Sequence, residues 1–430
     1  MFSTPLVLPL TYQSQDISFS DWISILTLGL APLIAHIVAG VPRISYLSSN
    51  RPRWHDSICH YNPTSIIWRY GMVTDRRIRA RSWNQADAAA TNALFWTSRG
   101  WDGSEAMIGA SLPYCTHLPA RVALFSREMA KTIIVTLQGL QAGIPLVIGL
   151  RTTRAADSFV HWVGVDTVFF PLAILGLLRL FSAFWLTDDY SYNAPQVIND
   201  SDGGTWPDCG VEQANRSSLD SLLIEGAHSS NPYQEKFRPA TFWPSRIFRA
   251  LYILPVLAMS TTCILYMGQW TKSASDIYST TFTTTSFILT VGYLCFASAT
   301  ALICSCYFAS GHTTTIIPCI SSLWYKIYTI AIMALGTLLF IFACVETRKT
   351  PCGRYTSGPG EGADLDACAT EELEVVSVAP GKSNFGLAST NWNGLDVNRT
   401  DEIRVYNFTG TCLGVANESY TQYLNISNAT

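Results

Sequence analysis

The sequence predicts an all-α integral membrane protein with about six transmembrane helices. Only 14% of its 430 residues are charged, against about 25% in soluble domains. Five long runs carry almost no charge, and they cover residues 22–41, 160–185, 247–268, 282–308 and 325–345. About twenty helical residues cross the hydrocarbon core of a bilayer, so each run is long enough. One such run could be a buried helix of a soluble protein, but five indicate a membrane protein.

Aromatic residues near the ends of these runs support the same boundaries. Indole rings favour the headgroup layer, where the ring is partly dry and its nitrogen stays wet. The tryptophans at or near predicted span ends are Trp22, Trp162, Trp185, Trp243, Trp270 and Trp324.

Positive charge predicts the orientation of the first span. Residues 1–21 contain no Lys or Arg, whereas residues 42–131 are rich in arginine, beginning with Arg43, Arg51 and Arg53. Cytoplasmic loops carry an excess of Lys and Arg close to the helix ends. We therefore expect an extracytoplasmic N-terminus and an Arg-rich cytoplasmic loop at 42–131.

Within this loop, residues 64–81 mix apolar and basic side chains in a way that suits a helix lying on a membrane surface. The expected partners are the lipid bilayer itself and anionic lipid headgroups. The alanine-rich stretch 84–96 predicts a second helix. Because these arginines follow a membrane span closely, they do not indicate nucleic-acid binding.

The C-terminal tail, residues 346–430, predicts a glycosylated extracytoplasmic segment, either irregular or β-rich. N-x-Ser/Thr sequons mark lumenal or extracellular chain, and the tail contains five of them, at Asn398, Asn407, Asn417, Asn425 and Asn428. The alternative is a cytoplasmic tail with accidental matches, and the nearby Arg348, Lys349 and Arg354 favour it. On the extracytoplasmic reading, Cys352 and Cys368 close the shortest disulfide loop.

If both termini lie on the same side, the number of spans is even. Residues 132–150 supply the sixth span, since they carry no charge between Lys131 and Arg151. This run is weakly apolar and contains Gln138 and Gln141, so it suits the inside of a bundle. The predicted spans are then 22–41, 132–150, 160–185, 247–268, 282–308 and 325–345. Residues 187–246 are polar and predict a disordered cytoplasmic loop.

Polar groups inside the spans are the candidate functional residues, because a charge at the bilayer centre costs about 2.5–3.5 kcal/mol on insertion scales. They are His36, Gln138, Gln141, His161 and Asp166. A histidine such as His36 could also simply bond to a neighbouring helix. For Asp166, the expected partners are His36, Gln138 or Gln141, because His161 lies five residues away and off the same helix face.

No catalytic, cofactor-binding or metal-binding motif stands out in the sequence. The cluster from His55 to His60 has too few ligands at usable spacing for a zinc site. We therefore expect a transport-related protein, or a membrane scaffold or sensor, in the plasma membrane or the endomembrane system. The alternative is a membrane-embedded enzyme that acts on a lipophilic metabolite.

Three stretches carry a family resemblance: residues 21–43, 51–81 and 93–107. They resemble an uncharacterised multi-pass membrane protein family of filamentous fungi. The resemblance covers the first span and the Arg-rich loop, and the tail lies outside it. It implies a fungal membrane protein and assigns no catalytic or binding residue.

Overall fold

The computed structural model describes most of the predicted membrane part of the chain. The described residues are 6–48, 50–108, 122, 125–151, 163–187, 236–268, 281–350 and 354–359, with four short strands between residues 387 and 414.

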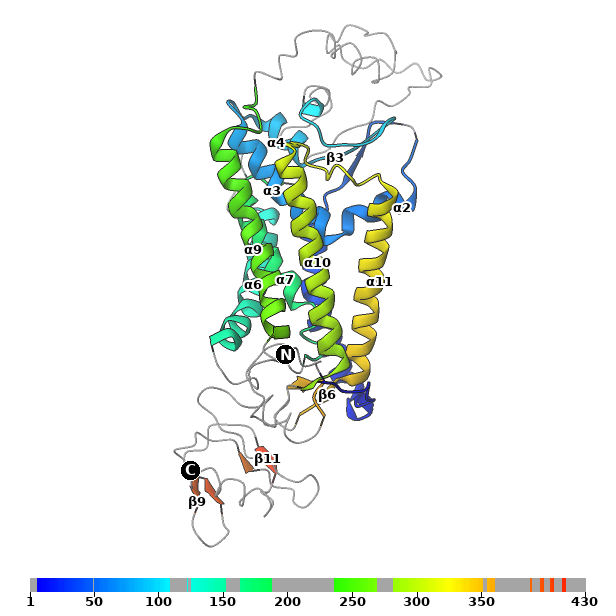
Figure 1. The fold of residues 1–430 in the computed structure, drawn as a ribbon, viewed down its shortest axis with the longest axis vertical. Helices are drawn as coiled ribbons and strands as arrows, with labels where there is room; N and C mark the ends of the chain where they lie inside the picture. Colours follow the sequence, from blue (N-terminus) through cyan, green and yellow to red (C-terminus); the bar gives the residue numbers. More distant parts are fainter. Residues whose placement is uncertain are drawn as a thin grey trace, which may run out of the picture.

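Five of the described helices are long and apolar enough to cross a membrane. They are α1 (Phe19–Gly40), α6 (Arg127–Arg151), α9 (Trp243–Gly268), α10 (Thr284–Ala309) and α11 (Leu323–Glu346). Their axes run along the length of the molecule (Figure 1). The weakly apolar run predicted as a span at 132–150 lies within α6. These helices make the chain a helical membrane protein.

The bundle has two ends with different chemistry. The Arg-rich end holds Gly40, Arg127, Trp243, Ala309 and Leu323, which are the terminal residues of the five long helices there. The opposite end, here called the tail end, holds their other termini.

Two small pairs of strands lie at the tail end. There β1 (Leu6–Val7) pairs with β5 (Thr281–Phe282), and β6 (Arg348–Lys349) pairs with β7 (Tyr355–Thr356). The first described residues and the start of the C-terminal tail are therefore on the same end of the bundle.

Residues 163–187 do not form the continuous helix predicted for 160–185. They begin with turns, continue as the short helix α7 (Phe170–Gly176) and end in the 3-10 helix η5 (Leu177–Ser182). The segment still connects both ends. The Val165 N–H donates to Thr347 Oγ1 at the tail end (2.9 Å), and Asn92 Nδ2 donates to the Trp185 carbonyl at the Arg-rich end (2.7 Å).

The interrupted backbone has a local and a tertiary cause. Pro171 in the first turn of α7 has no N–H to donate to a preceding helical turn. Gly29 of α1 lets the chain come close, since a Cβ there would collide with the Val165 carbonyl. Contacts with α1, α3 and α6 surround α7, and irregular backbone is tolerated at membrane depth where protein rather than lipid encloses it.

Part of the chain between α1 and α6 enters the bundle. The prediction that residues 64–81 form a helix on the membrane surface is therefore wrong, because the helix they form is buried in the protein. After α2 (Trp54–Ser57) and the 3-10 helix η2 (Ile58–Tyr61), helix α3 (Pro63–Arg79) packs against α1, α9 and η5, and 15 of its 17 residues are buried. The Asn62 side chain caps its N-terminus by accepting from the Thr64 N–H (2.9 Å). Gly71 lies against the ring of Tyr252, whose hydroxyl donates to the Ile67 carbonyl (2.6 Å).

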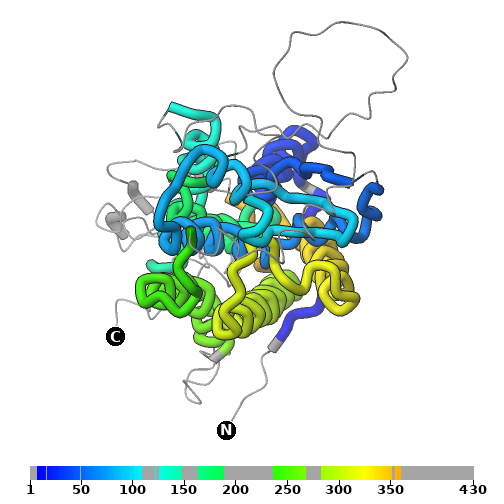
Figure 2. The backbone as a smooth tube through the Cα atoms, turned by 90° about the horizontal axis from the view of Figure 1, so that it is seen from above, coloured from blue at the N-terminus to red at the C-terminus, as the bar shows by residue number. Residues whose placement is uncertain are grey.

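The other described residues of the Arg-rich loop up to Ile108 lie across the near end of the bundle when the molecule is seen from above (Figure 2). Helix α4 (Gln85–Asn92) is shorter than the helix predicted at 84–96, because the chain turns into β3 (Leu94–Thr97). Strand β3 pairs in parallel with β2 (Ile44–Tyr46) and antiparallel with β4 (Gly100–Asp102).

The described part of the predicted disordered loop at 187–246 is ordered at its C-terminal end. Phe237 forms a β-bridge with Ala80, Lys236 pairs with Asp87 (2.5 Å), and α9 already begins at Trp243. Residues 188–235 lie outside the described residues.

In the tail, β8 (Leu387–Ala388) pairs with β11 (Cys412–Gly414), and β9 (Leu395–Val397) pairs with β10 (Ile403–Val405). The glycosylation sequons at Asn398, Asn407, Asn417, Asn425 and Asn428 fall outside the described residues, as do Cys352 and Cys368.

Candidate functional site

A buried network of charged groups centres on Asp75 of α3. The Asp75 carboxylate accepts from Arg79 Nε (3.0 Å), from Arg249 Nη2 (2.8 Å) and Nε (3.0 Å), and from the Ser245 hydroxyl. Arg79 also pairs with Glu105. Both Arg79 and Arg249 are at least 95% buried, with side-chain exposures of 1% and 5%. The Asp75 carboxylate is shared by both guanidinium groups and compensates their charge inside the protein, together with Glu105 at Arg79.

Other buried arginines hold the ends of helices. Arg69 donates to the carbonyls of Gly40 and Asn92 (2.9 Å each). Arg179 of η5 donates to the Ala39 carbonyl and pairs with Glu128 of α6 (3.1 Å). Cations are favourable at helix C-termini, where carbonyls have no intrahelical partner. Part of the arginine content of the loop therefore serves packing, and these side chains are not available to lipid headgroups.

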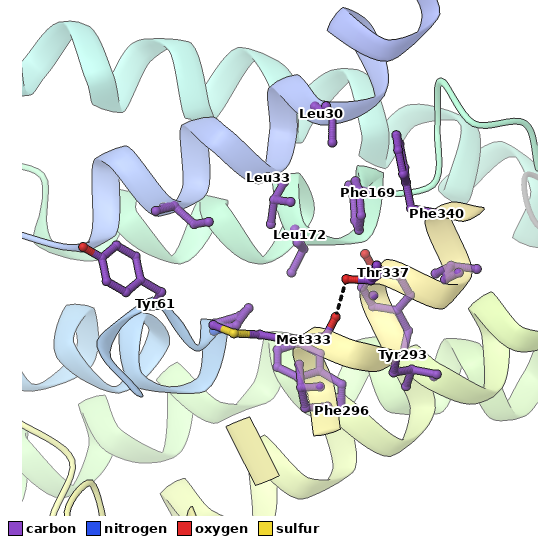
Figure 3. Close-up of a pocket in the computed structure, with 17 residues that line it drawn as sticks. Leu30, Leu33, Tyr61, Phe169, Leu172, Tyr293, Phe296, Met333, Thr337 and Phe340 are labelled. Carbon is purple, nitrogen blue, oxygen red and sulfur yellow. Dashed lines mark hydrogen bonds between the residues drawn. The ribbon is translucent and has the colours of Figure 1, made fainter. Parts of the chain in front are cut away.

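An apolar cavity lies at mid-depth between α1 and α11. We call it the midplane pocket; its volume is about 330 Å³. Its walls come from six elements, which are α1, η2, α3, α7 with the residue before it, α10 and α11. The lining residues are Leu30, Leu33, Ile37, Tyr61, Pro63, Phe169, Leu172, Gly292, Tyr293, Phe296, Ile332, Met333, Leu335, Gly336, Thr337, Leu339 and Phe340. Leu33 of α1 and Met333 of α11 lie on different sides of the pocket (Figure 3), and the rings of Phe169 and Phe340 stack beside each other with centroids 6.0 Å apart.

Few polar atoms line this pocket, and most of them are already engaged. The Tyr293 hydroxyl donates to the Val168 carbonyl (3.3 Å), and the Thr337 hydroxyl donates to Met333 of its own helix (2.9 Å). Tyr61 is 42% exposed and lies at the side toward the Arg-rich end. The pocket thus offers shape and apolar surface, with the Tyr61 ring at its edge toward the Arg-rich end.

Packing beside the pocket is fixed by a line of hydrogen bonds between α3, α10 and α11. Asn62 Nδ2 donates to Thr329 Oγ1 (2.9 Å), Thr64 Oγ1 bonds Thr300 Oγ1 (2.8 Å), and Ser65 Oγ bonds the Tyr325 hydroxyl (2.6 Å).

At the surface of the Arg-rich end, Asp56 of α2 pairs with Lys326 in the first turn of α11 (2.5 Å). Partial burial alone would raise the pKa of Asp56, but its hydrogen bond and attraction to Lys326 hold that pKa below the usual range.

The candidate intramembrane residues are not brought together. His36 is buried in α1 beside Tyr70, and its two ring nitrogens form no hydrogen bond with any described residue. Gln138 is half-buried and Gln141 is exposed on α6. His161 lies outside the described residues.

Asp166 has no ion pair or hydrogen bond with His36, Gln138 or Gln141, so the predicted partnerships are wrong. It lies in the turns before α7, where Oδ1 is buried without a hydrogen-bond partner among the described residues. The interrupted backbone explains the difference, because Asp166 does not stand on a helix face turned toward α1 or α6.

The pocket residues themselves were missed by sequence reasoning, since a leucine or phenylalanine in a span gives no signal that it borders a cavity. A sequence feature that coincides with the pocket is Gly336 in α11, where an added Cβ would meet no atom within 4 Å. A glycine without neighbours at its Cβ position borders open space, but the sequence does not show whether that space is a pocket or the surface of the protein.

Together, the five long helices, the interrupted crossing and the midplane pocket define a helical membrane protein with a cavity inside its membrane-spanning part. No protein-family model, curated protein or solved structure matches the chain.

Proposed function

We propose that the protein binds a lipophilic molecule in the midplane pocket, as part of a transport-related or sensing role in its membrane. The observation that carries the proposal is an apolar cavity of about 330 Å³ bordered by α1 and α11, two helices with many lipid-accessible apolar side chains. Ligand sites are typically concave and mostly apolar, with a few polar groups that fix orientation.

The shape of the lining supports an apolar occupant. Tyr61 stands at the edge toward the Arg-rich end, while mostly aliphatic, phenylalanine and glycine residues form the remaining walls. An elongated molecule with one polar end, oriented by Tyr61, fits this distribution. The rival function, an enzyme acting on a lipophilic metabolite, requires convergent polar or titratable groups. Among the residues lining the pocket, only Tyr61, Tyr293 and Thr337 carry a polar side-chain atom.

The pocket can be tested by filling it. Gly336→Leu places a side chain in open space and improves helix propensity. The matched control is Gly143→Leu in α6, where a Cβ likewise meets nothing within 4 Å, outside the pocket. Membranes are labelled with diazirine analogues of a phosphatidylcholine and of a sterol, and labelled peptides are identified by mass spectrometry.

We expect one probe to label residues 332–340 preferentially, at least fivefold less in Gly336→Leu and unchanged in Gly143→Leu. Uniform labelling of all lipid-facing helices by both probes, insensitive to Gly336→Leu, contradicts the proposal.

We further propose that the Arg-rich end is cytoplasmic and that both termini are extracytoplasmic. The arginine content of residues 42–131 and the sequon density of the tail support this orientation. Endoglycosidase treatment should shift the mobility of the expressed protein, and the shift should shrink when Asn398, Asn407 and Asn417 are replaced by Gln. No shift, in a host that glycosylates a control protein, contradicts it.

Two finer expectations remain proposals. Contact with anionic headgroups is restricted to arginines of the loop that are exposed, such as Arg43, Arg51, Arg53, Arg81 and Arg99. Membership of the fungal membrane protein family rests on residues 21–43, 51–81 and 93–107.

A further inference from the structure

A second cavity, separate from the midplane pocket, opens between α9 and α10 at the Arg-rich end. Its volume is about 370 Å³, and we call it the Arg246 groove. It is lined by Ala240, Thr241, Arg246, Arg249, Ala250, Ile253, Ser305, Phe308, Ala309 and Gly311. Small residues on both helices, Ala250 opposite Ser305 and Ala309, keep the groove open toward the outside, where all three are exposed.

The two arginines of the groove differ in what they already bind. Arg249 is buried at its base, where its guanidinium lies over the Phe308 ring (5.2 Å to the centroid) and bonds Asp75. Arg246, one turn earlier on the same helix, is exposed, and it forms no ion pair with any described residue. The groove therefore presents the guanidinium of Arg246 without an ion-pair partner among the described residues, whereas the charge of Arg249 at the bottom of the groove is balanced by Asp75.

The position of the groove along the bundle identifies the occupant. It lies along the first three turns of α9 and the end of α10, and α9 begins with the exposed Trp243 (68%). Tryptophan favours the headgroup level of a bilayer. Toward the middle of the bundle, the same two helices continue with exposed apolar side chains, including Leu254, Leu257 and Leu302. A molecule seated here has its polar part at Arg246 and its apolar part along α9 and α10.

We propose that the Arg246 groove binds the phosphate-bearing headgroup of an anionic phospholipid, with the acyl chains against α9 and α10. Arginine binds phosphate through several donors of its planar guanidinium, and the exposed hydroxyls of Thr241 and Ser305 lie in the same lining. The groove is independent of the Arg-rich loop at 42–131, in which no residue of its lining falls, and it does not rest on the proposed function of the midplane pocket.

The proposal is tested on the full-length protein purified in detergent. Anionic phosphatidylglycerol and phosphatidylinositol phosphate, zwitterionic phosphatidylcholine and soluble glycerol phosphate are titrated separately, and bound species are counted by native mass spectrometry. We expect anionic lipid to bind at least tenfold more tightly than phosphatidylcholine, and Arg246→Gln to weaken that binding about tenfold. The matched charge control is Arg127→Gln, at an exposed arginine on the same end in α6.

A steric variant tests the groove without changing its charge. Ala250→Phe fills the groove and should weaken anionic lipid binding as Arg246→Gln does, whereas Ala331→Phe, at an exposed alanine of α11, should not. Equal losses in Arg246→Gln and Arg127→Gln show diffuse attraction to the basic end and overturn the proposal. Glycerol phosphate that binds as tightly as the lipid shows a site for a free phosphate ester and also overturns it.

Discussion

Helices α3 and α11 are packed in opposite ways. Helix α3 carries three arginines in its last turn, yet 15 of its 17 residues are buried. Helix α11 is strongly apolar, yet only five of its 24 residues are buried, and three of these are Tyr325, Thr329 and Glu346. In a bilayer, lipid satisfies an apolar surface as well as protein does, whereas buried charges need partners that only protein provides. Between these two helices, the more polar one is therefore the more buried one.

The largest effect predicted by this comparison concerns Asp75. Asp75→Asn keeps the shape of the side chain but removes the charge that compensates the buried Arg79 and Arg249. Breaking a buried ion pair in this way costs about 3–5 kcal/mol, measured as the free energy of unfolding in SDS titrations of mixed micelles. Asp56→Asn, at a more exposed ion pair, should cost about 1 kcal/mol or less. Similar losses of unfolding free energy in Asp75→Asn and Asp56→Asn would show that water reaches the charged network around Asp75.

A matched pair of isoleucines compares the two helices directly. Ile67 of α3 is 1% exposed and Ile330 of α11 is 46% exposed. Ile67→Ala leaves a cavity inside the protein and should cost about 2–5 kcal/mol. Ile330→Ala exchanges one apolar surface for a smaller one against lipid or detergent and should change the unfolding free energy by about 0.5 kcal/mol or less. The comparison fails if Ile330→Ala destabilises the protein as much as Ile67→Ala.

The smallest effect concerns one of the hydrogen bonds that join the two helices. Tyr325→Phe removes the bond to Ser65, while Ser65 keeps its bond to the Cys59 carbonyl (2.7 Å). The expected loss is about 1 kcal/mol, seen as a lower midpoint in the same titrations. Tyr12→Phe, at a tyrosine that is 67% exposed, provides the control and should leave the midpoint unchanged. A Tyr325→Phe protein with the wild-type midpoint would show that this bond adds nothing to the other contacts between α3 and α11, which include the bond from Asn62 to Thr329.

The sequence by itself determined the class of protein and the positions of the long helices. Length and hydropathy suffice for α1, α9, α10 and α11, because a continuous run of about twenty apolar residues has few alternatives to a membrane-spanning helix. The weaker run at 132–150 was found by counting crossings, and it lies within α6.

Only the tertiary structure decided which segments are enclosed. The break at Pro171 and the close approach of Gly29 to Val165 convert a predicted span into turns and short helices, and the same packing separates Asp166 from its predicted partners. The arginines of α3 looked like headgroup ligands, because a local pattern cannot show that Asp75, Ser245 and Arg249 meet from segments about 170 residues apart. The midplane pocket and the Arg246 groove were likewise invisible, since a cavity is a property of several helices together and of no single run of residues.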